Sequence, residues 1–76
     1  MRVIIVEWVD SAFLQGWMSR DDVKTHRISP CVSVGLLVNE TRDQITIMQS
    51  AGKEQYGDGL TIPRVCIKRM RTLKVR

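Results

Sequence analysis

The stretch from residue 31 to residue 50, "CVSVGLLVNETRDQITIMQS", reads as two strands joined by a short polar turn. Apolar residues recur at every second position over residues 31–39 and again over residues 44–50, which is the period of a β-strand. The polar residues 40–43 between the two runs are typical of a hairpin turn. The stretch therefore predicts an antiparallel hairpin in a mainly β protein.

The first strand of this hairpin has two unequal faces. One face carries Val32, Val34, Leu36 and Val38, and the other carries Cys31, Ser33, Gly35 and Leu37. On the aliphatic face we expect Val34 and Leu36 to be core, so that either residue changed to Ala costs about 2–4 kcal/mol of stability. Gly35 in mid-strand indicates a bend, a bulge or the close approach of another backbone.

The residues before the hairpin predict one more strand and a long connection. Residues 2–9, "RVIIVEWV", have the length and composition of a strand and are apolar on both faces at the centre. We expect that strand to be covered on both sides. Ser19 followed by Asp22 fits a helix N-cap, so residues 20–25 form either a short helix or part of a long, partly ordered loop.

The residues after the hairpin predict a loop, a short strand, a helical turn and a final strand. Residues 51–59 contain three glycines and predict the loop, and residues 60–62 predict the short strand. Pro63 suits the first position of a helical turn, which we place at residues 63–67. The final strand is expected over residues 68–75.

Strict alternation cannot place Ile67, Met70 and Leu73 on one face of that final strand. We therefore expect a bulge or twist near residues 69–71. Five short strands with a one-turn helix before the last strand correspond to a small SH3-like or Sm-like β-barrel. We assign residues 1–76 to one such domain.

Size and composition favour a soluble domain of marginal stability. A chain of 76 residues buries only about 60% of its unfolded surface, so we expect self-association into a homo-oligomer to help it. No apolar run reaches the roughly 18 residues of a membrane span, and the charged residues near the start do not fit a signal peptide. A cytoplasmic location follows, in which Cys31 and Cys66 are expected to be reduced and buried.

The residues with chemical potential do not form a catalytic or metal-binding pattern. His26 is the single histidine, it lies in the polar connection, and neither cysteine is near it in a nucleophile motif. A closed zinc site needs about four ligands in paired spacings, which this chain lacks. We therefore expect no enzyme activity, no catalytic residue, no metal and no cofactor.

Two features favour binding. Trp8 is expected in the core, whereas Trp17 follows Gly16 in the long connection and suits either a plug or a platform for a base or a partner side chain. The C-terminal residues are basic without any acidic residue, which suits either a solvated edge or a phosphate-binding stripe. The candidate binding residues are Trp17, Arg64, Lys68, Arg69, Arg71 and Lys74, and Arg76 belongs to the same basic cluster.

Several short motifs together carry a family resemblance. "VEWVDS", "GW", "SVGLLV", "TIP" with "CIKRM", and the terminal "L-x-V" resemble a group of small, mostly uncharacterised phage and prophage proteins. The resemblance runs from Val6 to Leu73. It implies a small β-barrel made inside a bacterium during infection, and it implies no reaction.

Together these features predict a non-enzymatic binding module of phage type, acting in the cytoplasm of a host bacterium. The expected partner is a host or phage macromolecule, either protein or nucleic acid, and no membrane. The alternative is an oligomeric counter-defence protein that sequesters a small anionic nucleotide signal or blocks a host defence effector.

Overall fold

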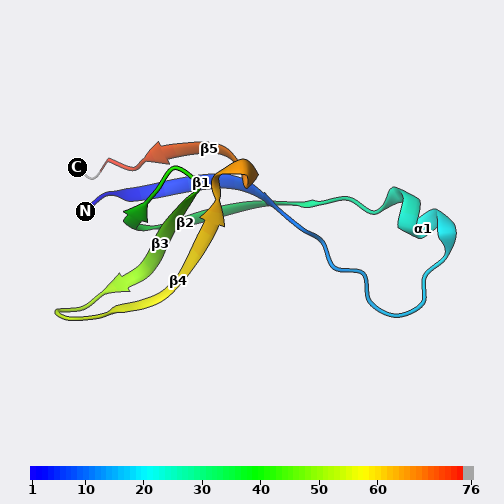
Figure 1. Cartoon of the computed structure of the whole chain (residues 1–76), viewed down its shortest axis with the longest axis horizontal. Helices are drawn as coiled ribbons and strands as arrows, with labels where there is room; N and C mark the ends of the chain where they lie inside the picture. The colour runs from blue at the N-terminus through cyan, green and yellow to red at the C-terminus, as the bar shows by residue number, and fades with distance from the viewer. Residues whose placement is uncertain (75–76) are drawn as a thin grey trace.

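A single antiparallel sheet of five strands dominates the computed structural model, which describes residues 1–74 (Figure 1). The strands are β1 (Val3–Asp10), β2 (Ser29–Glu40), β3 (Gln44–Ala51), β4 (Tyr56–Pro63) and β5 (Ile67–Thr72). A short helix, α1 (Arg20–Thr25), lies between β1 and β2, and a 3₁₀ turn, η1 (Arg64–Cys66), links β4 to β5. The mainly β prediction with a single helical turn before the last strand is confirmed.

The strand order β4-β3-β2-β1-β5 leaves β4 and β5 at opposite edges of the sheet. Among residues 1–74 no strand pairing joins these two edges, so the sheet is open. No helix in this part of the chain is long and apolar enough to cross a membrane.

The core lies on one face of the sheet, because alternate residues of the central strands point to the same side. Its buried side chains are Ile4, Val6, Ile45, Ile47 and Ile62. Five partly buried side chains pack against them, namely Trp8, Leu37, Cys66, Ile67 and Met70. The small number of buried side chains is consistent with the marginal stability expected for a chain of this length.

The core face of β2 is the face that contains Gly35, and our expectation for Val34 is wrong. Gly35 pairs with Ile4 and is buried, whereas Val34 is 53% exposed and Leu36 is only half-buried. A Cβ atom on Gly35 would lie 3.0 Å from the Ile47 Cβ and 3.0 Å from the Met48 carbonyl oxygen. Because β3 crosses so closely here, the face with the smaller side chains is the one that packs inward.

The exposure of Val34 changes the predicted cost of its truncation. We expect Val34→Ala to change the free energy of unfolding by no more than about 0.5 kcal/mol, as for other surface positions. Leu37→Ala, on the core face of the same strand, is the matched comparison and is expected to cost more. Urea denaturation of both variants checks this, and a loss for Val34→Ala as large as that for Leu37→Ala would contradict the assignment of the faces.

The β3–β4 hairpin diverges from the ribbon of β1 and β2. β2 pairs with β1 from Ser29 onward, but its pairing with β3 begins only at Leu36. The hairpin and the β1–β2 ribbon therefore extend toward opposite ends of a molecule 50 Å long (Figure 1). β4 begins at Tyr56, so the loop expected over residues 51–59 is too long, because backbone pairing with β3 continues despite the glycines.

The expected irregularity in β5 is confirmed, slightly earlier than residues 69–71. Glu7 pairs with Arg69 and Trp8 pairs with Ile67, so Lys68 is the extra residue of a bulge. The bulge places both Ile67 and Met70 against the core. β5 ends at Thr72, whereas the sequence predicted a strand to Val75, which lies outside the described residues. Pro63 is the last residue of β4 and the N-cap of η1, so the helical turn begins one residue later than predicted.

Of the two alternatives for residues 20–25, a short helix or a loop, the structure shows the helix, α1. The Ser19 hydroxyl accepts a hydrogen bond from the Asp22 N–H at 3.0 Å, as an N-cap does.

Two other expectations need correction. β1 is fully covered on one face only, with Val3, Ile5 and Val9 half-exposed on the other, and the free cysteines Cys31 and Cys66 are half-buried instead of buried.

Candidate functional site

Residues 11–28, which we call the arm, project from the end of the β1–β2 ribbon and carry large exposed apolar side chains (Figure 1). Trp17 is fully exposed (103%) and Phe13 is 86% exposed. Val23 and Ile28 are also exposed, and α1 contributes no buried residue. In a monomeric protein such a group of exposed apolar side chains is characteristic of an interaction surface.

Hydrogen bonds within the arm hold its backbone. Gly16, immediately before Trp17, has a φ of 75°, a left-handed conformation that glycine adopts without strain. Arg27 Nη1 donates to the carbonyl oxygens of Lys24 and His26, each at 2.9 Å, and so satisfies acceptors at the end of α1. His26 is the C-cap of α1, and its N–H donates to the Val23 carbonyl oxygen at 3.3 Å, which is a structural role.

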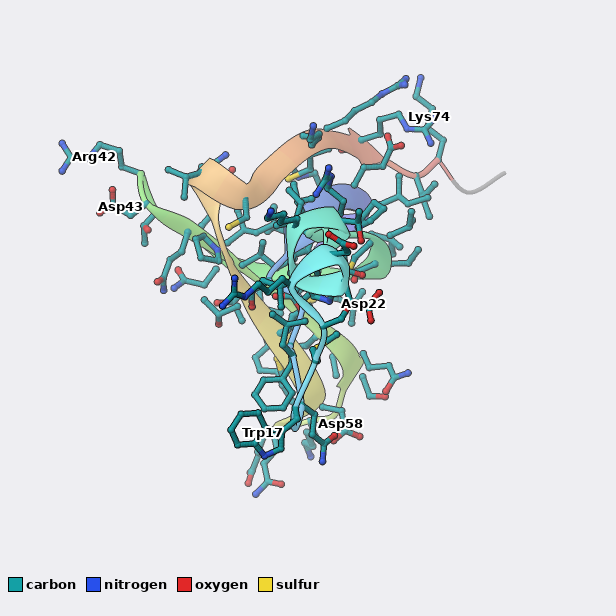
Figure 2. All side chains as sticks on the ribbon, turned by 90° about the vertical axis from the view of Figure 1, so that its right-hand side faces the viewer. Trp17, Asp22, Arg42, Asp43, Asp58 and Lys74 are labelled. Carbon is teal, nitrogen blue, oxygen red and sulfur yellow. The ribbon has the colours of Figure 1, made fainter. Side chains whose placement is uncertain are left out.

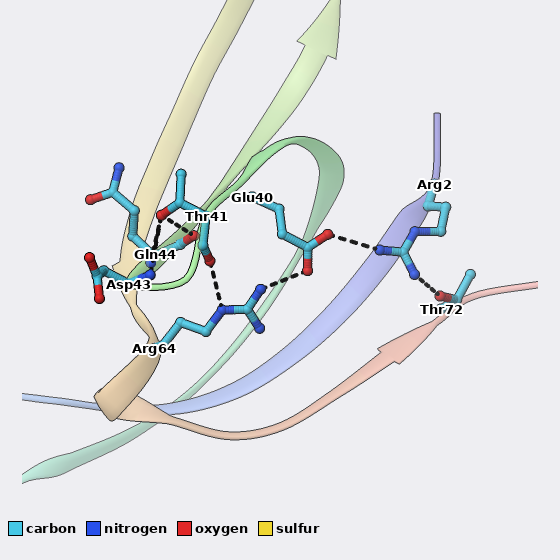
Figure 3. A network of polar contacts seen from close by, with 7 residues as sticks. All are labelled: Arg2, Glu40, Thr41, Asp43, Gln44, Arg64 and Thr72. Carbon is cyan, nitrogen blue, oxygen red and sulfur yellow. Dashed lines mark hydrogen bonds and ion pairs between the residues drawn. The ribbon is translucent and has the colours of Figure 1, made fainter.

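The structure separates Arg64 from the other basic candidates. Arg64 Nη2 contacts Glu40 Oε2 at 2.7 Å, and Arg64 Nε donates to the Thr41 carbonyl oxygen at 3.1 Å (Figure 3). The second oxygen of Glu40 lies 3.6 Å from Arg2 Nη2. Glu40 thus joins η1 to Arg2 just before β1, and Arg64 is engaged in this contact within the fold.

Arg69 and Arg71 lie on the face of the sheet opposite the core, which we call the outer face. They stand opposite Glu7 and Ile5 of β1, and Arg69 Nε lies 3.8 Å from Glu7 Oε2. Within residues 1–74 neither Arg71, Lys68 nor Lys74 takes part in an ion pair. The outer face therefore has a basic margin, but Glu7 partly neutralises it.

Trp17 and the basic strand do not form one site. Figure 2 shows Trp17 and Lys74 at opposite extremes of the molecule, seen from the end that carries the arm. The arm lies at the far end of the β1–β2 ribbon, whereas β5, which contains Lys68, Arg69 and Arg71, lies along the body of the sheet (Figure 1). The six candidate residues thus divide into an apolar arm, a basic margin and one structural arginine.

The outer face has an apolar centre that sequence reasoning missed. Val32 is 65% exposed, and with Val34 it stands opposite Glu7 and Ile5 of β1. The sequence-based prediction assigned Val34 to the core because it belongs to the more aliphatic face of β2. The signal for the correct face was Gly35, which marks the side that another backbone approaches.

No metal-binding cluster is present in the described part of the chain. Residues 1–74 contain no group of three or more His, Cys, Asp or Glu side chains placed to hold a metal ion. Trp8 is half-buried and donates from Nε1 to the Ser33 hydroxyl at 3.0 Å, so its one polar group already has a hydrogen-bond partner within the fold. A hollow of about 210 Å³ beside Lys68 is smaller than the roughly 300–1,000 Å³ typical of small-molecule pockets, and two larger hollows of about 380 and 400 Å³ are open surface depressions.

Comparison with protein-family models finds no match, and comparisons with curated proteins and with solved structures find none either.

Proposed function

We propose that this chain is a non-enzymatic binding module that engages a protein partner through its arm. The observation that supports the proposal best is the complete exposure of Trp17 together with the exposure of Phe13. Tryptophan and other aromatic side chains are enriched among the residues that carry most of the binding energy in protein interfaces. Hydrogen bonds within α1 and at its ends order residues 19–27 of the arm before binding, which lowers the entropy cost of association for that part.

A protein partner fits the arrangement better than a nucleic acid does. Proteins that bind single strands combine positive charge with aromatic platforms on the same surface. Here the exposed aromatic side chains belong to the arm, whereas Arg69 and Arg71 belong to β5. Glu7 beside Arg69 further weakens a phosphate-binding stripe.

The proposal extends to the architecture of the domain. We propose that the sheet curls into an SH3-like or Sm-like barrel, and the strand order and the 3₁₀ turn between β4 and β5 support this. The resemblance to phage and prophage proteins supports a partner from the host bacterium or the phage and action in the host cytoplasm. The nucleotide-sequestering alternative has less support, because the hollow beside Lys68 is smaller than a typical small-molecule pocket.

Capture from a bacterial lysate tests the role of the arm. The full chain is compared with a Phe13→Ser/Trp17→Ser variant and with a Tyr56→Ser/Val65→Ser control, which removes exposed apolar side chains outside the arm. We expect a protein that the wild type and the control both retain and that the arm variant loses. The arm variant should stay within about 0.5 kcal/mol of wild-type stability, because these side chains are exposed.

Nuclease treatment and a basic-strand variant separate the two partner classes. Retention should survive nuclease treatment and the combined change of Arg69, Arg71 and Lys74 to Ala. Any affinity for mixed oligonucleotides should be weak and fall strongly between about 50 and 200 mM salt. Loss of the captured protein after nuclease treatment, or equal loss in the control variant, would contradict an arm that binds protein.

A further inference from the structure

The sheet has a third open edge besides those of β4 and β5. Residues Ser29–Gly35 of β2 pair with β1 on one side, but β3 joins the other side only at Leu36. A hollow of about 240 Å³, lined by Val34, Met48 and Leu60 among others, separates this edge from the diverging hairpin. Seven consecutive residues therefore present a strand edge that no other part of residues 1–74 covers.

This edge has fewer of the features that protect the other two. Unpaired edges are templates for another strand, and proteins protect them with charges, bulges, proline or distorted backbone. β5 has the bulge at Lys68 and two arginines, and β4 contains Asp58 with a φ of 43° and ends at Pro63. By contrast, residues 28–36, "ISPCVSVGL", contain no charged side chain and only one proline.

The hydrogen-bonding groups that face the open edge can be assigned. The Leu37 N–H donates to the Arg2 carbonyl oxygen at 2.8 Å, so the peptide groups of Leu37 face β1. These groups alternate along an antiparallel strand, and the pairing with β1 is continuous, so those of Val34, Val32 and Pro30 face the open edge. Pro30 has no N–H, and proline is tolerated in a strand where that position faces solvent.

We propose that this edge pairs antiparallel with the same edge of a second copy of the chain, around a two-fold axis at Val32. In that arrangement each Val32 N–H meets the Val32 carbonyl oxygen of the second copy, and each Val34 N–H meets the Pro30 carbonyl oxygen. Every N–H that faces the open edge then has an acceptor. A two-fold axis at Val34 is excluded because it needs Leu36, which already pairs with Met48.

Surface area supports a second copy as the occupant. The chain exposes 6431 Å², whereas a compact monomer of 8.7 kDa exposes about 4,700 Å². Its radius of gyration is 15.8 Å, against about 11 Å for a compact domain of this length. The excess area, about 1,700 Å² per chain, exceeds the roughly 800 Å² per partner that a stable complex buries.

The two-fold arrangement also brings the exposed base of the arm in one copy close to the exposed β3–β4 hairpin of the other copy. Antiparallel pairing places Ser29 of one copy beside Gly35 of the other, which is the point where the β3–β4 hairpin departs. The base of each arm, including exposed Ile28, then approaches the partner's hairpin, including Leu60. This inference concerns β2 and does not rest on the proposed role of Trp17.

Disulfide crosslinking tests both the dimer and its axis. Val32→Cys and Val34→Cys are each placed in a Cys31→Ala/Cys66→Ala background of the full chain. Paired residues at position 32 would have Cα atoms about 5.5 Å apart, within disulfide range, whereas those at position 34 would be about 13 Å apart. We expect a crosslinked dimer from Val32→Cys alone. Equal crosslinking at both positions, or none at either, would overturn the proposal.

Sedimentation of the uncrosslinked protein provides a second measurement. Val32→Pro removes the N–H at the axis and leaves the pairing with β1, and we expect it to raise the dimer dissociation constant by at least about tenfold. Val32→Ala keeps the N–H and should stay within about threefold of wild type. A wild-type chain that sediments only as an 8.7 kDa species at high micromolar concentration would also overturn the proposal.

Discussion

Replacing Ile45 with alanine is expected to lower the free energy of unfolding by about 2–5 kcal/mol. Ile45 has no exposed surface, pairs with the equally buried Ile62, and belongs to a core that comprises five buried side chains within residues 1–74. With so few neighbours available to move into the cavity, the site cannot collapse around the loss. A chain of 76 residues has a total stability of roughly 4–11 kcal/mol, so much of the fold's stability depends on this side chain.

Val65→Ala is the matched control for Ile45→Ala, because Val65 is 94% exposed in η1. Its effect is expected to stay within about 0.5 kcal/mol. Urea denaturation followed by circular dichroism compares the two variants at one protein concentration, since self-association would add stability. Similar midpoints for both variants would show that the core does not lie on this face of the sheet.

Gly59→Ala is expected to lower the free energy of unfolding by about 1–3 kcal/mol. A Cβ atom on Gly59 would lie 2.7 Å from the Ile47 carbonyl oxygen and would also overlap the Met48 sulfur. The Met48 side chain can rotate away, but the carbonyl oxygen belongs to β3 and is fixed by the hairpin. Relief therefore requires a shift of backbone between β3 and β4.

Gly57→Ala is the control for Gly59→Ala, two residues earlier in the same strand. Its Cβ atom would meet only the Ser50 Cβ at 3.7 Å, which is ordinary van der Waals contact. We expect Gly57→Ala to be neutral or slightly stabilising, because alanine reduces the freedom of the unfolded chain. Adding Met48→Ala should not rescue Gly59→Ala. Full rescue would mean that the sulfur contact, and not the backbone contact, sets the cost.

Part of the candidate site was predictable from local sequence. Gly16 before Trp17 in a long polar connection marked Trp17 as either a plug or a platform, and Ser19 with Asp22 indicated the helix as one of two alternatives. The separation of Trp17 from the basic strand was not predictable, because it depends on the direction in which the β1–β2 ribbon leaves the body. Likewise, nothing local indicates that Arg64 contacts Glu40, 24 positions earlier in the chain.

The amino-acid sequence alone determined the features of this protein that depend on neighbouring residues. Alternation of apolar residues set the strands, the hydroxyl of Ser19 set the start of α1, and the spacing of Ile67 and Met70 required the bulge in β5. These features follow from period, capping and backbone geometry within a few residues. They needed no knowledge of distant contacts.

The tertiary structure alone decided which face of β2 is buried, how far β4 extends, and where the sheet stays open. Val34 and Ser33 lie on opposite faces of the same strand, and side-chain hydrophobicity favours the wrong one. The choice depends on β3, which approaches Gly35 closely enough to exclude a Cβ atom and then diverges after Met48. Burial is a property of the packed sheet, so steric fit between strands outweighs the hydrophobicity of a single strand.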